Sequence, residues 1–434
     1  MQSSEGQARP ILWVLFLALL LRLSLFLVVA PNPDGFFSPD GRDFVEISTK
    51  LGDVYAGHEG RPFTLGLVHP PGYPIVIAAV FSVIDDAPWL VVLLQIAVGV
   101  VTVWLTYRLA SQLLGPVPAL WAALALAVDP ISIVLTNYIQ PETIFTFLVV
   151  AGTLLWSRGL QSRSMWLGAG AGALFGAAVL FRPIGQYLPA VVIPATLLLH
   201  GGRWRKRLAF AIALLLVFAI PVGGWIVRNT AVSGVPVLSA GEGTNLLYFR
   251  AASALGDAEG LSFTDAQKQL RGLVQHEVEP GMNRAERSRI QRSLAIKVLF
   301  DHPVAALKSI VKGVGLMMIG PGRAELLHLL GDPTPTQISG PVQLLLIAAE
   351  IVLYSIILIG AVFGSYYLLR NRKYSAAVVL FSVILYFIAA AAVTTPYSRY
   401  RVPIMPFIAI LAGYGVAAWR RWPKVDRSEE ELSP

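Results

Sequence analysis

Two aspartates, Asp40 and Asp43, lie three residues apart just after the first apolar segment of the chain. The apolar residues Phe44, Ile47 and Leu51 follow at helical spacing, which predicts an amphipathic helix that begins at this acidic turn. A carboxylate there could act as a general base toward a hydroxyl group, or it could hold a metal ion. Capping of the helix is the structural alternative, because Asp is a favoured residue at the N-cap.

Two segments with proline at a predicted helix start contain further candidate functional residues. Residues 69–74 read HPPGYP, a pattern typical of a loop that enters a short helix, since proline is favoured at the first helical position. His69 could bind an acceptor or move a proton, and packing at a membrane interface is the structural alternative. Glu142 follows Pro141 at the start of another apolar segment. It suits the positive end of the helix dipole, but an ionisable group at membrane depth is also a candidate for function.

Four arginines, Arg182, Arg228, Arg399 and Arg401, lie at the ends of apolar segments that the charge distribution assigns to the outer side of a membrane. Arginine binds phosphate through two parallel hydrogen bonds and keeps its charge in a low-dielectric site. Each one alone could extend to the membrane interface. Together with nearby carboxylates, they suit a lipid-linked phosphate beside an acceptor. Arg22, inside the first apolar segment, is predicted to have a structural role within a helix bundle.

Composition defines the elements that must position these residues. Of the 434 residues, 55% are apolar and 14% are charged, whereas soluble domains average about 25% charged residues. The mean hydropathy is +0.65. The sequence has no cysteine, which excludes disulfides and thiolate metal sites. The formal net charge of +8 is better explained by basic cytoplasmic loops than by a nucleic-acid partner. We therefore predict an all-α protein that spans a lipid bilayer many times.

About ten apolar segments are predicted to span the membrane, with the first retained as a helix rather than cleaved. They are residues 11–30, 90–113, 117–135, 141–157, 165–182, 186–200, 207–227, 343–369, 375–395 and 402–420. Segments 71–84 and 303–320 are predicted to be short juxtamembrane helices, because one is too short and the other carries two lysines. With this count, all the basic clusters and both termini are cytoplasmic. The candidate residues then lie on the extracytoplasmic face of a multi-pass cell-membrane protein.

Four parts of the chain follow from this division. Residues 1–227 form a membrane module whose first loop, 31–89, carries the acidic turn, and residues 228–342 form an extracytoplasmic helical segment. Residues 343–420 form the C-terminal membrane helices, and 421–434 a cytoplasmic tail. In the extracytoplasmic segment, capping-box patterns at 264–267 and 283–286 predict two helix starts. Gly168, Gly172 and Gly176 recur at intervals of four residues and predict close packing between membrane helices.

Several short motifs occur in the same order as in one family. They are DGRDF at 40–44, HPPGYP at 69–74, Asp-Pro then Pro-Glu within 129–142, a Gly-rich helix closing in RP at 182–183, WIVRN at 225–229 followed by GTN at 243–245, and RYRVP at 399–403. In these motifs the chain resembles the dolichyl-phosphate-mannose–protein mannosyltransferase-like superfamily (glycosyltransferase family 39), which includes the bacterial aminoarabinose lipid A transferases. The resemblance covers nearly the whole chain. It implies the C-type glycosyltransferase fold with short outer juxtamembrane helices.

The resemblance also implies a reaction, in which a sugar passes with inversion from a polyprenyl-phosphate donor to a lipid, glycan or protein acceptor. Asp40 matches the family's first-loop acid and would be the general base, with Asp43 as runner-up. Arg182 matches a position that helps to hold the donor phosphate. Further candidates for phosphate binding are Arg228, Arg399 and Arg401. Candidates for substrate binding are His69, Tyr73, Glu142, Asn229 and Tyr400.

The chain departs from parts of this family, and two other function classes stay open. It lacks the Asp-Glu pair of the protein mannosyltransferases in its first loop and the Trp-Trp-Asp element of oligosaccharyltransferases. These departures weigh against protein O-mannosylation and against a dedicated metal site, so no cofactor is expected, although the carboxylates would accept a divalent cation. The alternatives are a lipid-linked sugar flippase or transporter, and a polymerase or ligase that uses a diphosphate-linked donor. No internal repeat of the transporter type is visible.

Overall fold

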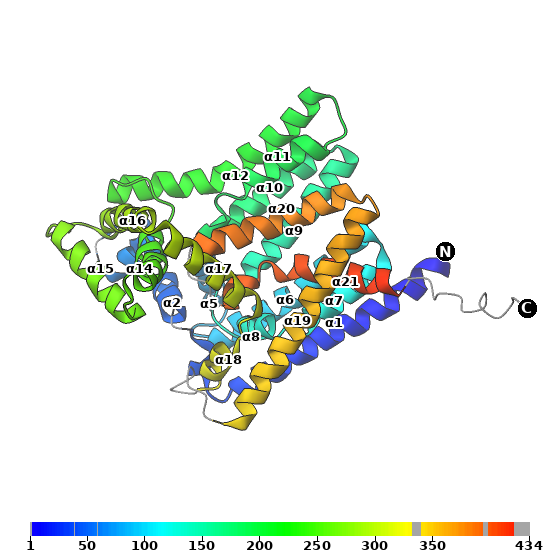
Figure 1. Ribbon diagram of the computed structural model, residues 1–434, viewed down its shortest axis with the longest axis horizontal. Coiled ribbons are helices and arrows are strands. Elements are labelled where there is room, and N and C mark those ends of the chain that lie inside the picture. Colours follow the sequence, from blue (N-terminus) through cyan, green and yellow to red (C-terminus); the bar gives the residue numbers. More distant parts are fainter. Residues whose placement is uncertain (1, 39, 59, 332–339, 394–397, 421–434) are drawn as a thin grey trace, which may run out of the picture.

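A computed structural model describes residues 2–38, 40–58, 60–331, 340–393 and 398–420. In this part of the chain the secondary structure consists of helices and turns, without β-strands. Figure 1 shows long helices that run side by side and a group of shorter helices gathered at one end. The predicted all-α architecture is therefore confirmed for the described residues.

Within the described residues, six helices are long and apolar enough to cross a bilayer. Proline or glycine flanks several of their ends, where the backbone cannot continue the helical hydrogen bonds. They are α1 (Gln2–Val29), α6 (Pro88–Leu114), α9 (Glu142–Ser162), α12 (Trp204–Ser233), α19 (Pro341–Arg370) and α20 (Tyr374–Val393).

The other predicted spans are bent or short, so the count of ten is not confirmed. The segment 117–135 forms α7 (Pro116–Ala127) and α8 (Pro130–Thr136), which meet at 59°, because Pro130 starts a new helix capped by Asp129. Helices α10 (Met165–Val179), α11 (Pro189–Leu199) and α21 (Met405–Trp419) are apolar but shorter than a full span. If each bent pair is one span, the described part of the chain has up to eight candidate spans by length and composition.

The segment predicted to be interfacial at 303–320 belongs to the second bent pair. Helix α17 (Pro303–Ile319) meets α18 (Arg323–Leu329) at 57°, with Gly320 at the break. The other segment kept out of the count, 71–84, forms the ten-residue helix α5 (Gly72–Phe81), which is too short to cross a bilayer. Two more short helices of the first loop, α2 (Gly41–Thr49) and α4 (Arg61–Val68), precede it.

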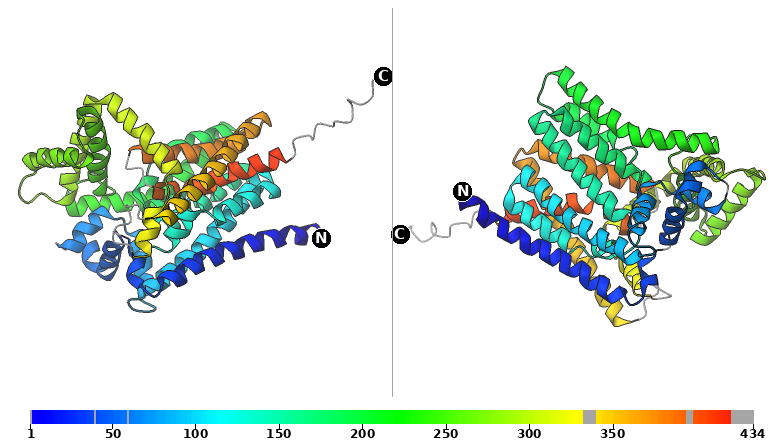
Figure 2. Two further views of the ribbon diagram at one scale, coloured as in Figure 1. Left: turned by 60° about the horizontal axis from the view of Figure 1, so that its bottom comes forward. Right: turned by 180° about the vertical axis from the view of Figure 1, so that it is seen from behind.

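The two ends of the bundle differ in what they carry. The start of α1 and the end of α21 lie at one end, together with the α9–α10, α11–α12 and α19–α20 junctions (Figures 1 and 2). The opposite end carries the first-loop helices and a cap made of α13 (Gly241–Asn245), α14 (Ala252–Glu259), α15 (Phe263–Glu277) and α16 (Arg284–Asp301). The basic junctions and the candidate residues are thus separated along the bundle.

Small residues allow close packing between α10 and its neighbour α12. A Cβ atom built on Gly172 would lie 2.2 Å from the backbone oxygen of Leu214, and one on Gly176 would lie 2.6 Å from that of Phe218. No side chain fits at those distances. The predicted helix-packing role of these glycines is confirmed.

The cap has a small apolar core of its own, which includes Leu247, Leu270 and Leu294. Its predicted helix start at 283–286 is confirmed, since the Asn283 side chain caps α16 in a complete capping box with Glu286. The start at 264–267 was placed two residues too late. Ser262 caps α15 instead, because its hydroxyl accepts from the Asp265 amide and lies beside the Asp265 carboxylate.

Arg22 is buried inside the bundle, as predicted. Its guanidinium donates to the carbonyl oxygens of Ala18 and Ala127, at 3.0 and 3.2 Å. These bonds tie the first helix to the end of α7, and Asp129 supplies a nearby negative charge.

Candidate active site

A cavity of about 510 Å³ lies between the cap, the first-loop helices and the cap-side ends of the membrane helices. Its wall contains Asp40 just before α2, His69 between α4 and α5, and Glu142 at the start of α9. The wall also contains Arg182, three residues after the end of α10, and Arg399 and Tyr400 of the short helix η4 (Ser398–Arg401). Six of the residues predicted from the sequence therefore meet in one cavity.

Asp40 occupies the N-cap position of α2 but makes no capping hydrogen bond with its side chain. Its Oδ2 instead lies 3.4 Å from Nη1 of Arg399, a residue 359 positions along the chain. The Asp40 side chain is 45% exposed, so a ligand in the cavity can reach it. The capping alternative is thus not adopted in the structure.

A second ion pair, between Glu142 and Arg182, lies in the same wall. The Arg182 guanidinium donates through Nη1 to Glu142 Oε1, and the Glu142 side chain is almost fully buried. The other carboxylate oxygen, Glu142 Oε2, is buried without a hydrogen-bond partner among the described residues, and so is Gln140 Oε1. Buried polar atoms without partners are uncommon in proteins, so this wall can accept hydrogen bonds from a ligand.

The aromatic ring of Tyr400 contacts both arginines. The guanidinium carbon of Arg182 lies 5.0 Å from the ring centre, and that of Arg399 lies 5.6 Å from it. Both distances are within the range of cation–π attraction. Tyr400 thereby contacts two positive charges of the cavity wall, and fixed positive charges can bind a phosphate or a developing anion.

His69 lies against the first-loop acids. Its Nε2 is 3.9 Å from Asp43 Oδ2, and its ring packs 4.6 Å from that of Phe44. Burial lowers the pKa of His69 below the ordinary value of about 6.5, while Asp40 and Asp43 partly oppose that effect. His69 is therefore neutral at neutral pH and can accept a proton.

Tyr73 lies beneath this group rather than in the cavity wall. It is fully buried, its ring packs edge-on against Phe44, and its hydroxyl donates to Gln95 at 2.9 Å. Gln95 in turn donates to the carbonyl oxygen of Tyr138. This chain of contacts supports the position of α2 on the bundle.

Besides Asp43 and Tyr73, three more predicted residues are outside the set of described residues that line the cavity: Arg228, Asn229 and Arg401. Arg228, near the end of α12, donates to Val54 in the first loop and to Asn229, and it stacks on Trp225. Asn229 is buried and donates to the carbonyl oxygens of Val237 and Leu238. Both hold α12 to neighbouring loops.

Arg401 is also separate from the cavity. It is fully buried, and its Nη1 donates to the carbonyl oxygens of Met317, Met318 and Gly320 at the end of α17. The guanidinium also lies 3.6 Å from the ring centre of Tyr354. The adjacent residues Arg399 and Arg401 thus point to different environments.

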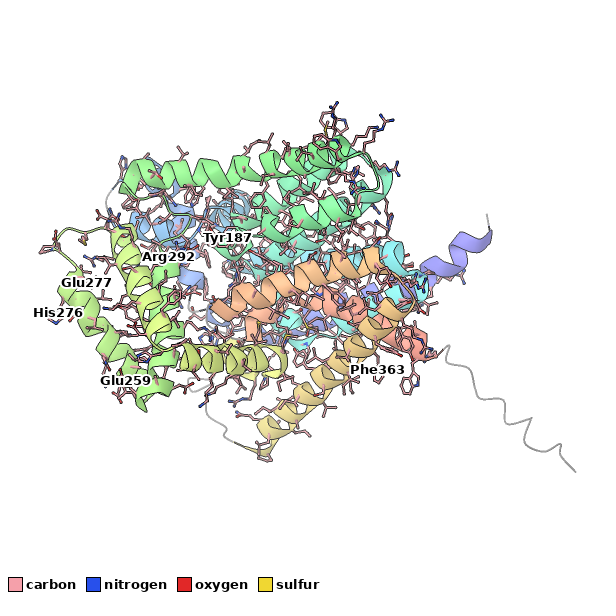
Figure 3. All side chains as sticks on the ribbon, turned by 45° about the horizontal axis from the view of Figure 1, so that its top comes forward. Tyr187, Glu259, His276, Glu277, Arg292 and Phe363 are labelled. Atoms are coloured by element: carbon pink, nitrogen blue, oxygen red, sulfur yellow. The ribbon has the colours of Figure 1, made fainter. Side chains whose placement is uncertain are left out.

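Another polar group in the wall was missed by the sequence analysis. Gln186 follows the short helix η2 (Pro183–Gly185), and its amide donates to Glu242 Oε1 of α13. Asn245 and Arg292 line the same part of the cavity. Figure 3 shows Arg292 on α16 in the same region as Tyr187, which also lines the cavity. The GTN motif at 243–245 marked this segment, but not which side chains face the cavity.

Burial raises the pKa of Glu242 above its ordinary value of about 4.5, whereas the Gln186 bond and Arg292 partly oppose that effect. Among the described residues, no group of three or more His, Asp and Glu side chains is arranged to hold a metal ion. The described side chains of the cavity wall include carboxylates, an imidazole and guanidinium groups.

Comparison with known proteins bears on the same region. Residues 68–225 match the sequence profile of the family described as dolichyl-phosphate-mannose-protein mannosyltransferase. This range begins just before His69 and includes Glu142 and Arg182. A sequence comparison with curated proteins finds no match.

Among solved structures, the chain is similar to the archaeal oligosaccharyltransferase AglB from Archaeoglobus fulgidus, in complex with an inhibitory peptide and a dolichol-phosphate. The TM-score is 0.52 at 14% sequence identity, over 93% of this chain and 50% of that chain. The same enzyme tethered with an acceptor peptide matches with a TM-score of 0.51, at 15% identity over 94% and 49% of the two chains. The chain spans about half the length of this enzyme.

A match to ArnT from Cupriavidus metallidurans bound to undecaprenyl phosphate has a TM-score of 0.41, at 15% identity over 94% and 78% of the two chains. At this score it adds nothing about the fold. The resemblance inferred from the sequence motifs is confirmed by the family profile over residues 68–225, and the chain has the C-type glycosyltransferase fold.

Proposed function

We propose that this protein is a membrane glycosyltransferase that moves a sugar from a polyprenyl-phosphate donor to an acceptor hydroxyl on the extracytoplasmic face, with inversion at the anomeric carbon. The observation that carries this proposal is the joint placement of Asp40, Arg182 and Arg399 in one cavity. A reachable carboxylate and two fixed guanidinium groups are the parts that such a transfer needs. The match to the mannosyltransferase family profile and the fold shared with AglB support it.

In the proposed reaction, Asp40 takes the proton of the acceptor hydroxyl, whose oxygen attacks the anomeric carbon. The bond between that carbon and the phosphate oxygen breaks, and its electron pair leaves with the polyprenyl phosphate. Asp40 is preferred over Asp43 because it lines the cavity, whereas Asp43 is paired with His69 behind it. Asp43 and His69 would position the loop and accept a proton relayed from Asp40.

Arg182 and Arg399 would hold the donor phosphate, and Tyr400 contacts both guanidinium groups. A guanidinium has five N–H donors, and in Arg182 the described contact with Glu142 uses Nη1. Glu142 would orient Arg182 and accept from the substrate through its second oxygen. Arg228, Asn229, Tyr73 and Arg401 would position the surrounding elements, because each bonds to the protein outside the cavity lining.

The proposed donor and product both carry a lipid chain, so the bilayer is the third participant. The AglB structure was solved with a dolichol-phosphate, which supports a phosphate-linked lipid in this fold. We place the basic junctions and both termini in the cytoplasm and the cavity on the outer side of the cell membrane. This orientation rests on the positive-inside rule.

The proposal is tested with purified protein in lipid nanodiscs and a set of radiolabelled polyprenyl-phosphate sugars. Wild-type protein is expected to transfer the label to acceptor lipids or glycans from the native membrane. Asp40→Asn is expected to lower the rate by about 10²–10⁴-fold, the contribution typical of general base catalysis. Arg182→Ala is expected to weaken donor binding by about tenfold or more, because a charged hydrogen bond to phosphate is lost.

Asp34→Asn is the matched control, because Asp34 is an exposed first-loop aspartate paired with Arg42. It should transfer sugar like the wild type. Full activity in both Asp40→Asn and Asp43→Asn would remove the catalytic assignment. Movement of the labelled lipid between leaflets without sugar transfer would favour a flippase, and activity confined to diphosphate-linked donors would favour a polymerase or ligase.

A further inference from the structure

We infer that Gln186, Glu242, Asn245 and Arg292 form the subsite that holds the hydroxyl groups of the donor's sugar. This inference rests on the proposed function and adds a part of the cavity that the phosphate and base assignments leave unused. All four residues line the same cavity as Arg182 and Asp40.

The backbone sets the distance between this group and the phosphate site. Gln186 follows Arg182 by four residues, with η2 between them. A 3₁₀ helix rises about 2.0 Å per residue, so a separation of four residues corresponds to roughly 8 Å along the helix axis. That distance is comparable to the length of one glycosyl phosphate. A donor whose phosphate lies against Arg182 can therefore place its sugar ring beside Gln186.

The chemistry of the group suits hydroxyls better than a second phosphate. The Gln186 amide nitrogen donates to Glu242 Oε1, which fixes two planar side chains relative to each other. The Gln186 carbonyl oxygen and Glu242 Oε2 are acceptors, whereas Asn245 and Arg292 supply N–H donors. A hydroxyl both donates and accepts, and a phosphate mainly accepts. A second phosphate at this position would meet the Glu242 carboxylate, so a monophosphate donor fits better than a diphosphate.

Apolar neighbours complete the subsite. Leu246, just after α13, and Ile296 of α16 line the same cavity, and so does Tyr187, which is 57% exposed. Such surfaces pack against the C–H groups of a sugar while the polar side chains fix its orientation. Burial makes the ionised form of Glu242 costly, and the Gln186 bond and Arg292 oppose this effect only in part, so a sugar hydroxyl donating to Glu242 would lower the cost further.

The test separates sugar binding from phosphate binding. Purified protein in nanodiscs is titrated with a short-chain polyprenyl phosphate alone and with its hexose and pentose conjugates. Glu242→Ala and Gln186→Ala are expected to lower the affinity for the preferred conjugate about tenfold. They are expected to change the affinity for the bare phosphate by less than about twofold. Arg182→Ala should lower the affinity for both the bare phosphate and the conjugate. Glu242→Gln keeps a hydrogen-bonding group of the same shape and should recover part of the lost affinity.

Glu277→Gln is the matched control, because Glu277 is exposed on α15 and lies at the outer edge of the cap in Figure 3, away from Tyr187 and Arg292. It should change neither affinity. Equal weakening of both ligands by Glu242→Ala and Gln186→Ala, or no weakening of either, would overturn the subsite alone. Wild-type protein that binds none of the conjugates would overturn the proposed function and the subsite together.

Discussion

At the residue scale, the ion pairs of the cavity separate side chains that look alike in the sequence. Arg399 and Arg401 are two positions apart, yet Arg399 pairs with Asp40 in the cavity and Arg401 donates to three carbonyl oxygens of another helix end. Asp40 lies at an N-cap position but does not cap with its side chain. Position in a motif therefore does not define the role of a polar residue; its partners in the fold do.

Glu242 leads to a prediction about pH and stability. Its pKa is raised by burial in the folded protein, so the folded state holds the proton more tightly than the unfolded chain does. The resulting stability is present below the ordinary pKa of about 4.5 and is lost as pH rises through the folded-state value. At pH 8 the ionised carboxylate of Glu242 remains partly buried. Without ligand, Glu242→Gln is expected to raise Tm by about 2 °C at pH 8, and by less at pH 5.

Thermal unfolding in detergent at pH 5 and pH 8 measures this difference. The control is again Glu277→Gln, whose exposed side chain should leave Tm unchanged at both values. An equal change in Tm at the two pH values would contradict the burial argument. Combined with weaker sugar binding, a more stable Glu242→Gln variant would indicate a group kept for function at some cost in stability.

At the element scale, the short helix α10 packs closely against α12 because glycines on the facing side carry no side chains. Its glycines allow the α12 backbone to approach closely, and α10 ends at the segment that carries Arg182 and Gln186. Close approach of the two backbones thus contributes to the placement of Arg182 and Gln186, and so of the proposed phosphate site and sugar subsite. The same packing links α12, whose end holds Arg228 against the first loop, to the cavity.

Gly172→Ala is expected to destabilise the protein by about 1–3 kcal/mol, the usual effect of overpacking. The added Cβ would lie 2.2 Å from the Leu214 backbone oxygen, and a backbone atom cannot rotate away. Gly223→Ala in α12 is the control, because a Cβ there meets nothing within 4 Å. It should be neutral or stabilising, by up to about 1 kcal/mol of helix propensity. Thermal unfolding of both variants in detergent gives the comparison, and similar values for the two would refute the packing role.

At the scale of the whole molecule, the cap and the basic junctions lie at opposite ends of the bundle (Figures 1 and 2). This separation agrees with a cavity on one face of the membrane and a positive-inside orientation. The cap contributes Glu242 and Arg292, the first loop contributes Asp40, and the membrane helices contribute Glu142 and Arg182. The cavity therefore requires the first loop, the cap and the bundle together.

Cysteine labelling tests the orientation directly, because the sequence has no cysteine. Glu277→Cys in the cap is expected to react with a membrane-impermeant maleimide added to intact cells. Ser162→Cys and Lys373→Cys, at exposed positions of two basic junctions, should react after the membrane is permeabilised. The opposite pattern would place the cavity in the cytoplasm.

Much of the helical framework could be predicted, since each of the ten predicted spans overlaps at least one helix. The lengths and bends of the helices could be predicted less well. The span at 117–135 breaks at Pro130, and three other predicted spans form helices shorter than the bilayer requires. Hydropathy averages over a window and does not locate such breaks. Of the candidate residues, Asp40, His69, Glu142, Arg182, Arg399 and Tyr400 line the cavity, whereas Gln186 and Glu242 were missed.

The sequence by itself determined that this protein is a bundle of apolar helices with polar residues collected at their ends, because hydropathy and helix-end signals are local properties of the chain. Only the tertiary structure decided which of those polar residues meet. Asp40 and Arg399 are 359 positions apart, and Gln186 and Glu242 are 56 apart. Such pairs depend on how each helix is packed and rotated against its neighbours, which no local pattern of residues specifies.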